Sequence, residues 1–391
     1  MSVPAFLGGS PVVTEPWPTW PVWEHTEVES VLGVLDSGVW GGYSTAVADF
    51  ETRFAEFTGA QHCITTSNGT VSLVAALIAL GVHPGDEVLV PAYTFAATAN
   101  AVGIVGATPV FVDIERDTWN MDIRAAESAI TSRTAAIVPV HFAGHPVDMD
   151  ALLLLAGRHG LAVLEDAAHA PGSTWRGRPV GALGAMGSFS FQSNKNITSG
   201  EGGALVANDS ALAHAAWSVC NHGRDKEGDW YQHPRVGSNH RITGLQAAIL
   251  CAQLDRYPEQ LATRMAAGRH LRAALAGTGL VPASWDARVE RHAHHMLPLH
   301  YDPEQFSGMT RERFVAAMAA EGVPLPTGYP VPLNRQRAFG GRRGECPVAD
   351  LACLDTLWIS HNVLLSGPAR LSLIVEAADR VRASAHDINR W

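Results

Sequence analysis

Short apolar runs alternate with segments of helical periodicity through the first half of this chain. Seven of these runs are typical of buried strands, because they are bounded by glycine, proline or polar residues. They are His62–Thr66, Glu87–Pro91, Pro109–Asp113, Ala135–His141, Leu161–Glu165, Gly187–Phe191 and Gly203–Ala207. The amphipathic segments between them are Val71–Leu80, Thr94–Val105, Ala125–Ile130 and Met149–His159. This alternation predicts an α/β fold with a large, mostly parallel seven-stranded sheet that helices cover on both faces.

The regions outside this alternation have different patterns. Residues 1–25 are rich in proline and tryptophan and predict an irregular arm packed on a surface. After Pro282 the pattern becomes that of a smaller α+β unit. Its strand-like segment is Met296–Tyr301 and its helical segment is Arg311–Glu321. Helical patterns elsewhere in the chain are Glu27–Phe57, Leu245–Arg256 and Tyr257–Leu275. We therefore expect an arm at 1–25, a large domain at 26–260 and a small C-terminal domain at 261–391.

Composition narrows the class of protein. Of the 391 residues, 47% are hydrophobic and 17% charged, which indicates a globular chain rather than a disordered one. A formal net charge of −10 argues against a nucleic-acid or membrane-surface partner. The five cysteines form no C-x-x-C pair, so neither a disulfide framework nor a zinc site is indicated. The first residues lack a basic region followed by an apolar stretch, and we expect a cytoplasmic protein.

The segment Gly187–Gly203 carries the most informative chemistry. An apolar strand-like run there leads to a single lysine, Lys195, surrounded by small and polar residues. A lysine that leaves a core loses solvation, so that its amine becomes partly neutral and nucleophilic. Such an amine suits a lysine that forms a Schiff base with an aldehyde cofactor. A surface lysine in a glycine-rich turn is the alternative.

Three other strand ends carry residues that fit the same cofactor. Small residues over Thr66–Thr70 open a helix and suit a phosphate, although an ordinary helix cap is also possible. The aromatic residues Tyr93 and Phe95 follow the next run and could stack on a heterocycle or lie in the core. Asp166 ends a buried run and could pair with a cationic ring nitrogen, or cap a helix or pair with arginine. Taken in order with Lys195, these elements describe a site for pyridoxal phosphate.

The chain closely resembles the sugar and cyclitol aminotransferases of the DegT/DnrJ/EryC1/StrS family, which belong to the fold type I pyridoxal phosphate enzymes. The matching segments cover essentially the whole chain: Ser67–Thr70, Val90–Phe95, Pro139–Gly144, Glu165–His169, Phe189–Lys195, Thr198–Gly203, Gly237–Arg241, Glu321–Pro324 and Gly328–Leu333. This resemblance implies that Lys195 carries the cofactor and that Asp166 pairs with the pyridine nitrogen. It further implies that Phe95 stacks on the ring and that His169 lies near the oxygen-bearing face of the ring.

The resemblance also implies how the phosphate is held. Gly69, Thr70 and Ser190 would bind it within one chain. Asn239 matches an asparagine that the neighbouring subunit contributes in this family, which implies an obligate homodimer with shared active sites. Some relatives carry histidine in place of the lysine and remove a hydroxyl group, so Lys195 favours transamination.

The substrate is indicated less directly. The N-terminal arm, Ser37–Gly42, Thr198–Gly202 and Trp358–His361 look most like members that act on unphosphorylated carbocycles, namely inosose-type aminotransferases and aminohydroxybenzoate synthases. We therefore expect a cyclitol ketone or a related C7 carbocycle as acceptor and L-glutamine as donor. Candidate substrate contacts are Trp40, His222, Arg224 and Tyr329, for each of which packing or solvation is an equal alternative.

Other functions remain open at this point. Cationic residues over Asn334–Arg337 and at Arg342 and Arg343 could bind a nucleotide-sugar diphosphate, or form a solvated loop. The same cofactor could also support aromatising dehydration of an aminocyclohexenone, which product analysis would separate from transamination. A third hypothesis is a non-catalytic sensor that retains the cofactor-binding fold, and the presence of Lys195 and Asp166 argues against it.

Overall fold

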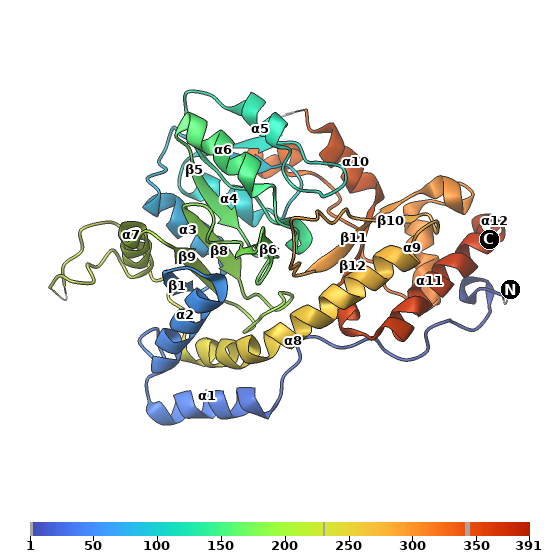
Figure 1. Ribbon diagram of the computed structural model, residues 1–391, viewed down its shortest axis with the longest axis horizontal. Coiled ribbons are helices and arrows are strands. Elements are labelled where there is room, and N and C mark those ends of the chain that lie inside the picture. The colour runs from blue at the N-terminus through green and yellow to red at the C-terminus, as the bar shows by residue number, and fades with distance from the viewer. Residues whose placement is uncertain (1–2, 230, 341–344) are drawn as a thin grey trace.

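The computed structural model describes residues 3–229, 231–340 and 345–391. Its centre is a seven-stranded sheet with strand order β1-β9-β8-β5-β4-β2-β3, in which only β9 runs antiparallel to its neighbours (Figure 1). Its strands are β1 His62–Thr66, β2 Glu87–Pro91, β3 Thr108–Val112, β4 Thr134–Ile137, β5 Ala162–Asp166, β8 Met186–Ser190 and β9 Gly203–Ala207. This sheet confirms the predicted α/β class. The fourth predicted strand is too long by four residues, because β4 ends at Ile137 before Pro139.

Helices bury both faces of this sheet. In β2, Leu89 belongs to the hydrophobic core on one face, whereas Val88 and Val90 belong to the core on the other. The first core is filled by side chains of α2, α5, α6 and α8, and the second by those of α3, α4 and α7. The bounds of the helices in this part of the chain are α1 His25–Ser37, α2 Thr45–Thr58, α3 Gly69–Ala79, α4 Ala97–Ile104, α5 Ile123–Ala129, α6 Met149–His159 and α7 Ser210–Cys220.

One long helix, α8 Gly244–Ala274, connects the large sheet with the C-terminal part of the chain (Figure 1). The sequence predicts two helical segments that meet at Tyr257, but the structure has one continuous helix with Pro258 inside it. A proline inside a helix costs about 3 kcal/mol. Burial on both sides of Pro258 offsets this cost, because Leu250 packs in the core of the large sheet and Leu271 in the C-terminal core. The predicted domain boundary at residue 260 falls inside this helix and remains a prediction.

The C-terminal part contains a small antiparallel sheet packed against helices. Its core includes Leu297, Leu299, Phe314 and Ile374. Its elements are β10 Leu280–Pro282, β11 Met296–Tyr301, β12 Thr356–Ser360, α9 Arg311–Ala320, α10 Pro347–Asp355, α11 Pro368–Ala383 and α12 Ala385–Arg390. The remaining short elements of the chain are the hairpin β6 Thr174–Trp175 and β7 Arg178–Pro179 and the 3-10 helices η1 Ala5–Leu7, η2 Phe142–Gly144, η3 Pro303–Phe306, η4 Leu333–Arg335, η5 Arg337–Phe339 and η6 Val363–Leu365.

The N-terminal arm lies along the C-terminal part before it reaches α1 (Figure 1). The buried carboxylate of Glu321 accepts hydrogen bonds from the amides of Ala5 (2.8 Å) and Val12 (3.0 Å). Farther along the arm, the indole Nε1 of Trp20 donates to the carbonyl of Ser193 at 2.9 Å. The arm therefore brings Trp20 next to the turn that carries Lys195. Among the described residues, no helix has the length and apolar character that crossing a membrane requires.

Candidate active site

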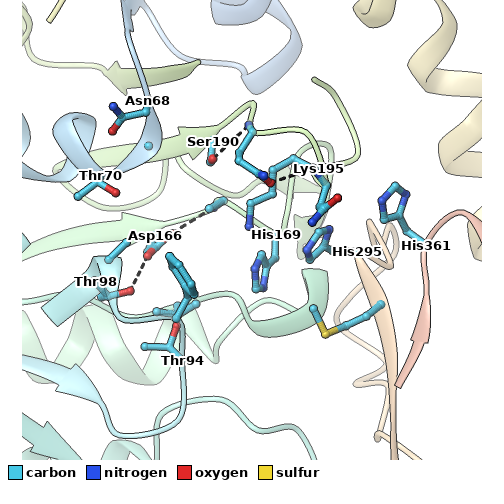
Figure 2. Close-up of a pocket in the computed structure, with 18 of the residues that line it drawn as sticks. Asn68, Thr70, Thr94, Thr98, Asp166, His169, Ser190, Lys195, His295 and His361 are labelled. Atoms are coloured by element: carbon cyan, nitrogen blue, oxygen red, sulfur yellow. Dashed lines mark hydrogen bonds between the residues drawn. The ribbon is translucent and has the colours of Figure 1, made fainter. Parts of the chain in front are cut away.

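A cavity of about 1060 Å³ lies where the carboxyl ends of the large-sheet strands face the small sheet. Open α/β sheets bind ligands at this edge, because strand ends and helix N-termini converge there. Figure 2 shows side chains that follow β1, β5 and β8 pointing towards one another across this space. Eight of the twelve residues that the sequence suggested line the cavity: Gly69, Thr70, Phe95, Asp166, His169, Ser190, Lys195 and Tyr329.

Lys195 enters the cavity from a tight turn after β8. Its backbone amide donates to the carbonyl of Gln192 at 2.8 Å, which closes the turn. Burial lowers the pKa of Lys195 from 10.5 to about 8, although the nearby Asp166 acts against this shift. A larger fraction of the amine is therefore neutral at physiological pH than for an exposed lysine. The structure thus places a nucleophilic amine inside the cavity.

Asp166 is the last residue of β5 and is buried on the floor of the cavity. Its carboxylate accepts hydrogen bonds from the Thr98 hydroxyl (2.8 Å) and the Ala168 amide (3.2 Å). Burial raises the pKa of Asp166, while these two hydrogen bonds and Lys195 oppose the rise. A cationic group in the cavity would therefore stabilise the ionised carboxylate, as expected for a partner of a protonated ring nitrogen.

The preceding acid, Glu165, has a different role. Its carboxylate is fully buried and accepts hydrogen bonds from the amides of Gly181 (2.7 Å), Leu183 (2.7 Å) and Gly184 (2.6 Å). It also contacts His141 Nε2 at 2.9 Å. These contacts fix the loop before β8. Successive side chains of a strand point to opposite faces, so β5 directs Glu165 towards the buried loop before β8 and Asp166 into the cavity.

The N-terminus of α3 forms a potential anion site. The side chain of Asn68 caps the helix by accepting from the Val71 amide at 3.0 Å. The amides of Gly69 and Thr70 are the first two of the helix and have no partner within it, since an α-helix leaves its first amides free. A Cβ on Gly69 would lie 2.7 Å from Cβ of Ser190, so glycine is needed for Ser190 to approach this helix end. Two amides and a hydroxyl thus converge as a phosphate requires.

His169 and His295 stack at the side of the cavity, with ring centroids 4.2 Å apart. Burial lowers the pKa of both well below 6.5, so both rings are neutral. The amide nitrogen of Asn196 donates to Ala293 O at 2.8 Å, so its oxygen faces His295 Nδ1 at 3.0 Å. His295 therefore carries its proton on Nδ1. His169 Nδ1, buried and without a partner among the described residues, is available to a cofactor oxygen.

These residues fit pyridoxal phosphate. The cavity provides an amine for the aldehyde, a carboxylate for the ring nitrogen, a helix end for the phosphate and an unpaired imidazole nitrogen. The seven-stranded sheet with a smaller C-terminal sheet has the architecture of the fold type I pyridoxal phosphate enzymes. Fold and site together define that class.

Comparison with known proteins gives the family. The model of the "DegT/DnrJ/EryC1/StrS aminotransferase family" matches residues 21–377. The chain is 42% identical to a protein of Streptoalloteichus tenebrarius provisionally named L-glutamine:3-amino-2,3-dideoxy-scyllo-inosose aminotransferase, over 97% of each chain. It is 35% identical to L-glutamine:2-deoxy-scyllo-inosose aminotransferase of Micromonospora echinospora, over 99% of this chain and 100% of that one.

A solved structure agrees with these relatives. The crystal structure of 3-amino-5-hydroxybenzoic acid synthase matches 93% of this chain and 98% of its own, with 36% identity and a TM-score of 0.87. The chain belongs to the DegT/DnrJ/EryC1/StrS aminotransferase family and is a pyridoxal phosphate-dependent aminotransferase. The class and family predicted from the sequence are thereby confirmed.

Four of the suggested residues do not line the cavity. Trp40 is 53% exposed and donates to Leu35 O at 3.2 Å. His222 and Asn239 are exposed, and half-buried Arg224 donates to the hydroxyl of Tyr43 at 3.2 Å. In Figure 1 the segment that follows α7 extends away from the rest of the chain. The roles suggested for these residues remain predictions.

Two other suggestions have different outcomes in the structure. Tyr329 lines the cavity and packs edge-on against Tyr93 (5.3 Å between ring centroids) and Trp358 (5.7 Å). In the cationic segment, Arg335 pairs with Asp350. Arg342 and Arg343 lie outside the described residues.

Sequence reasoning missed several residues of the cavity. Thr98, which holds Asp166, is far from it in sequence and falls inside a predicted amphipathic helix. His295 belongs to the unusual run His292–His295, and this concentration of histidines was a usable signal. Trp20 also lines the cavity, as do Trp358 and His361, which the sequence analysis noted only for their resemblance to carbocycle-specific members. Trp20 and His361 reach the cavity through the arm and the small sheet, so only the tertiary structure places them there.

Proposed function

We propose that this enzyme transfers the amino group of L-glutamine to the ketone of a cyclitol in aminocyclitol biosynthesis. The observation that carries the proposal is the convergence of Lys195, Asp166 and the α3 N-terminus on one cavity. The choice of substrates is supported by relatives named as L-glutamine-dependent scyllo-inosose aminotransferases, which match nearly the whole chain.

In this proposal Lys195 anchors the cofactor through its ε-amine, and Asp166 holds the ring nitrogen. The phosphate is bound by Gly69, Thr70 and Ser190. Phe95 and His169 flank the ring, Phe95 from the cavity rim, where it is 62% exposed. When bound, pyridoxal phosphate supplies the electron sink that allows an amino group to be exchanged with a ketone.

The proton transfer, the charge on the ring nitrogen and the exclusion of water depend on residues of the chain itself. With the cofactor bound to the donor, the free Lys195 amine would accept a proton from the donor Cα and deliver it onward, since its lowered pKa suits both directions. Asp166 remains ionised and keeps the ring nitrogen protonated. Tyr329 and Trp358 form an aromatic wall that excludes water and can pack on a carbocycle.

The proposal includes a homodimer with shared sites. Asn239 is exposed in the single chain, as a residue offered to a neighbouring subunit must be. Exposed apolar side chains also follow one face of α1 and the loop after it: Val28, Leu32, Leu35, Val39 and Trp40. Such a face is suited to burial between subunits. All five cysteines are free, which fits a reducing, cytoplasmic compartment.

A second candidate reaction is dehydration that forms an aromatic ring. It is favoured by the similarity to the structure of 3-amino-5-hydroxybenzoic acid synthase, with a TM-score of 0.87. Both reactions need the same anchoring lysine and ring-nitrogen acid. They differ in the product, so the product decides between them.

The test is the absorbance spectrum of the purified protein with pyridoxal phosphate, recorded before and after L-glutamine is added without any ketone. We expect the band of the bound pyridoxal form to be replaced by that of the pyridoxamine form. Keto-cyclitols that restore the first band are then acceptors. A band that L-glutamine, L-glutamate and L-alanine all leave unchanged would favour the dehydration reaction.

A further inference from the structure

The turn that carries Lys195 is held by side chains from distant parts of the chain. Trp20, from the N-terminal arm, donates its indole N–H to Ser193 O at 2.9 Å. The backbone of Asn194 lies beside His361, which follows β12, and acts to raise the pKa of that imidazole. The two rings pack edge to face, with centroids 4.6 Å apart. The arm thus holds Ser193 of the turn by a hydrogen bond, and His361 lies beside the next residue of the turn.

One buried guanidinium joins these two rings. Arg264 lies in α8 and is fully buried. Its Nε donates to His361 O and its Nη2 to His361 Nδ1, both at 3.3 Å. Its Cζ lies 5.3 Å from the centroid of the Trp20 ring and 6.0 Å from that of Tyr257. Arg264 therefore contacts both residues that hold the turn, without lining the cavity itself.

These contacts define the protonation of His361. Arginine has only donors, so Nδ1 of His361 must accept from Arg264. Burial and the charge of Arg264 lower the pKa of His361 to about 3, and the ring is neutral. Its one proton then lies on Nε2, the nitrogen free to donate to the backbone of Asn194. The guanidinium thus sets the tautomer that the turn requires.

The burial of Arg264 is energetically unfavourable. Removing a charge from water costs several kcal/mol unless strong partners compensate. Its partners here are an imidazole, a carbonyl and aromatic rings, and its Nη1 has no hydrogen-bond partner among the described residues. Burial lowers its pKa to about 10, so it stays charged at neutral pH. A charge buried with such weak partners is better explained by the positioning of neighbouring residues than by a contribution to the stability of the fold.

We propose that Arg264 is a positioning residue for Lys195, acting through His361 and Trp20 on the turn Gln192–Lys195. The proposal rests on the role of Lys195 given above. Without these contacts the turn becomes less rigid and the Lys195 amine becomes more exposed to solvent. The pKa of the lysine then rises, and its amine is less well positioned. A displacement of about 1 Å at a reacting group can cost a hundredfold in rate.

The test uses the rate at which the cofactor-free protein captures pyridoxal phosphate, followed by absorbance as a function of pH. Arg264→Met removes the guanidinium, and His361→Phe keeps a ring beside Trp20 but removes the Nδ1 acceptor for Arg264 and the Nε2 donor. His361 is neutral, so its replacement changes no charge. The matched control is Arg272→Met, since Arg272 is a half-buried cation farther along the same helix. Reduction with borohydride and mass spectrometry then locate the cofactor.

For the wild type we expect capture to rise with pH through the lysine pKa of about 8. In Arg264→Met and in His361→Phe this midpoint moves towards the ordinary lysine value. Capture at neutral pH falls about tenfold for each unit of that movement. The double variant should resemble either single variant, because both interrupt one chain of contacts. Arg272→Met should capture the cofactor as the wild type does.

Two results would overturn this role. If both variants melt at lower temperature but keep the wild-type midpoint and capture rate, Arg264 is purely structural. If Arg264→Met alone shifts the midpoint, the guanidinium acts through its charge and not through His361. A wild type that is not labelled at Lys195 would instead contradict the proposed function. The chain has only one other lysine, Lys226, so the site of labelling is unambiguous.

Discussion

Two regions of this molecule carry residues suited to the same reaction, but they differ in how complete they are within one chain. The strand-end wall, defined as Gly69, Asp166, His169, Ser190 and Lys195, lines one cavity. The outer segment, residues 221–241, contains His222, Arg224 and Asn239, and none of its described residues lines that cavity. The first region forms a site by itself, whereas the second presents polar groups to solvent.

The difference follows from how each region is positioned. Parallel strands bring their carboxyl ends to one edge, so the residues of the strand-end wall converge without any partner. The outer segment extends from the end of α7 and has no such constraint (Figure 1). In the proposed homodimer, the polar residues of this segment would serve the cavity of a second copy. The predictions below test this division of the site.

The largest effect should come from Lys195→Ala. Removing the amine abolishes covalent attachment and removes a general acid–base group, whose contribution is about 10²–10⁴-fold. Turnover should fall at least that far, and borohydride should no longer fix the cofactor to the protein. The control is Lys226→Ala, because Lys226 is the other lysine and lies exposed in the outer segment. Retained attachment in Lys195→Ala would contradict the strand-end wall as the cofactor site.

The strand-end wall could be predicted from the sequence to a large extent, for a physical reason. Each of its residues lies at the end of a short apolar run or shortly after one, and strand ends are placed by topology rather than by detailed packing. The contact between Arg264 and His361 spans 97 positions and depends on how α8 packs against the segment that follows β12. Trp20 likewise reaches the turn of Lys195 from 173 positions away. No local sequence pattern encodes such contacts, so the residues that support the turn of Lys195 could be identified only from the structure.

Asp166→Asn should have the next largest effect. An amide holds no negative charge for the ring nitrogen, and removal of one preorganised electrostatic partner costs about 10²–10³ in kcat. The amide oxygen can still accept from the Ala168 amide, and the amide NH2 can donate to the Thr98 hydroxyl, so the fold should be kept. Cofactor content, measured by absorbance, should fall much less than kcat. Equal losses of cofactor and turnover would show that Asp166 acts in binding rather than in chemistry.

Asn239→Ala tests the outer segment directly. If this residue completes the phosphate site of a second copy, its loss should weaken pyridoxal phosphate binding by about tenfold, as for one hydrogen bond of about 1.4 kcal/mol. Fluorescence titration of the cofactor-free protein measures this change.

Mixing two inactive or weakened variants provides the decisive control. In a mixed dimer of Lys195→Ala and Asn239→Ala, one site receives its lysine and its asparagine from different chains and is intact. Activity and tight cofactor binding should therefore reappear after the subunits are exchanged. If mixing restores nothing, Asn239 serves its own chain, and the division between the two regions is wrong.

The smallest effect should come from Arg224→Met. Arg224 donates to the hydroxyl of Tyr43 at 3.2 Å, and that hydroxyl donates to Asn221 Oδ1 at 3.2 Å. A cation in such a partly exposed position contributes about 0.2–1 kcal/mol, so KM for the keto substrate should rise about fivefold or less. With kcat unchanged, steady-state kinetics would show a loss of uniform substrate binding. Lys226→Met, a cation of the same segment, should leave KM unaltered. A fall in kcat comparable to that of Asp166→Asn would place Arg224 among the reacting groups and end the distinction between the two regions.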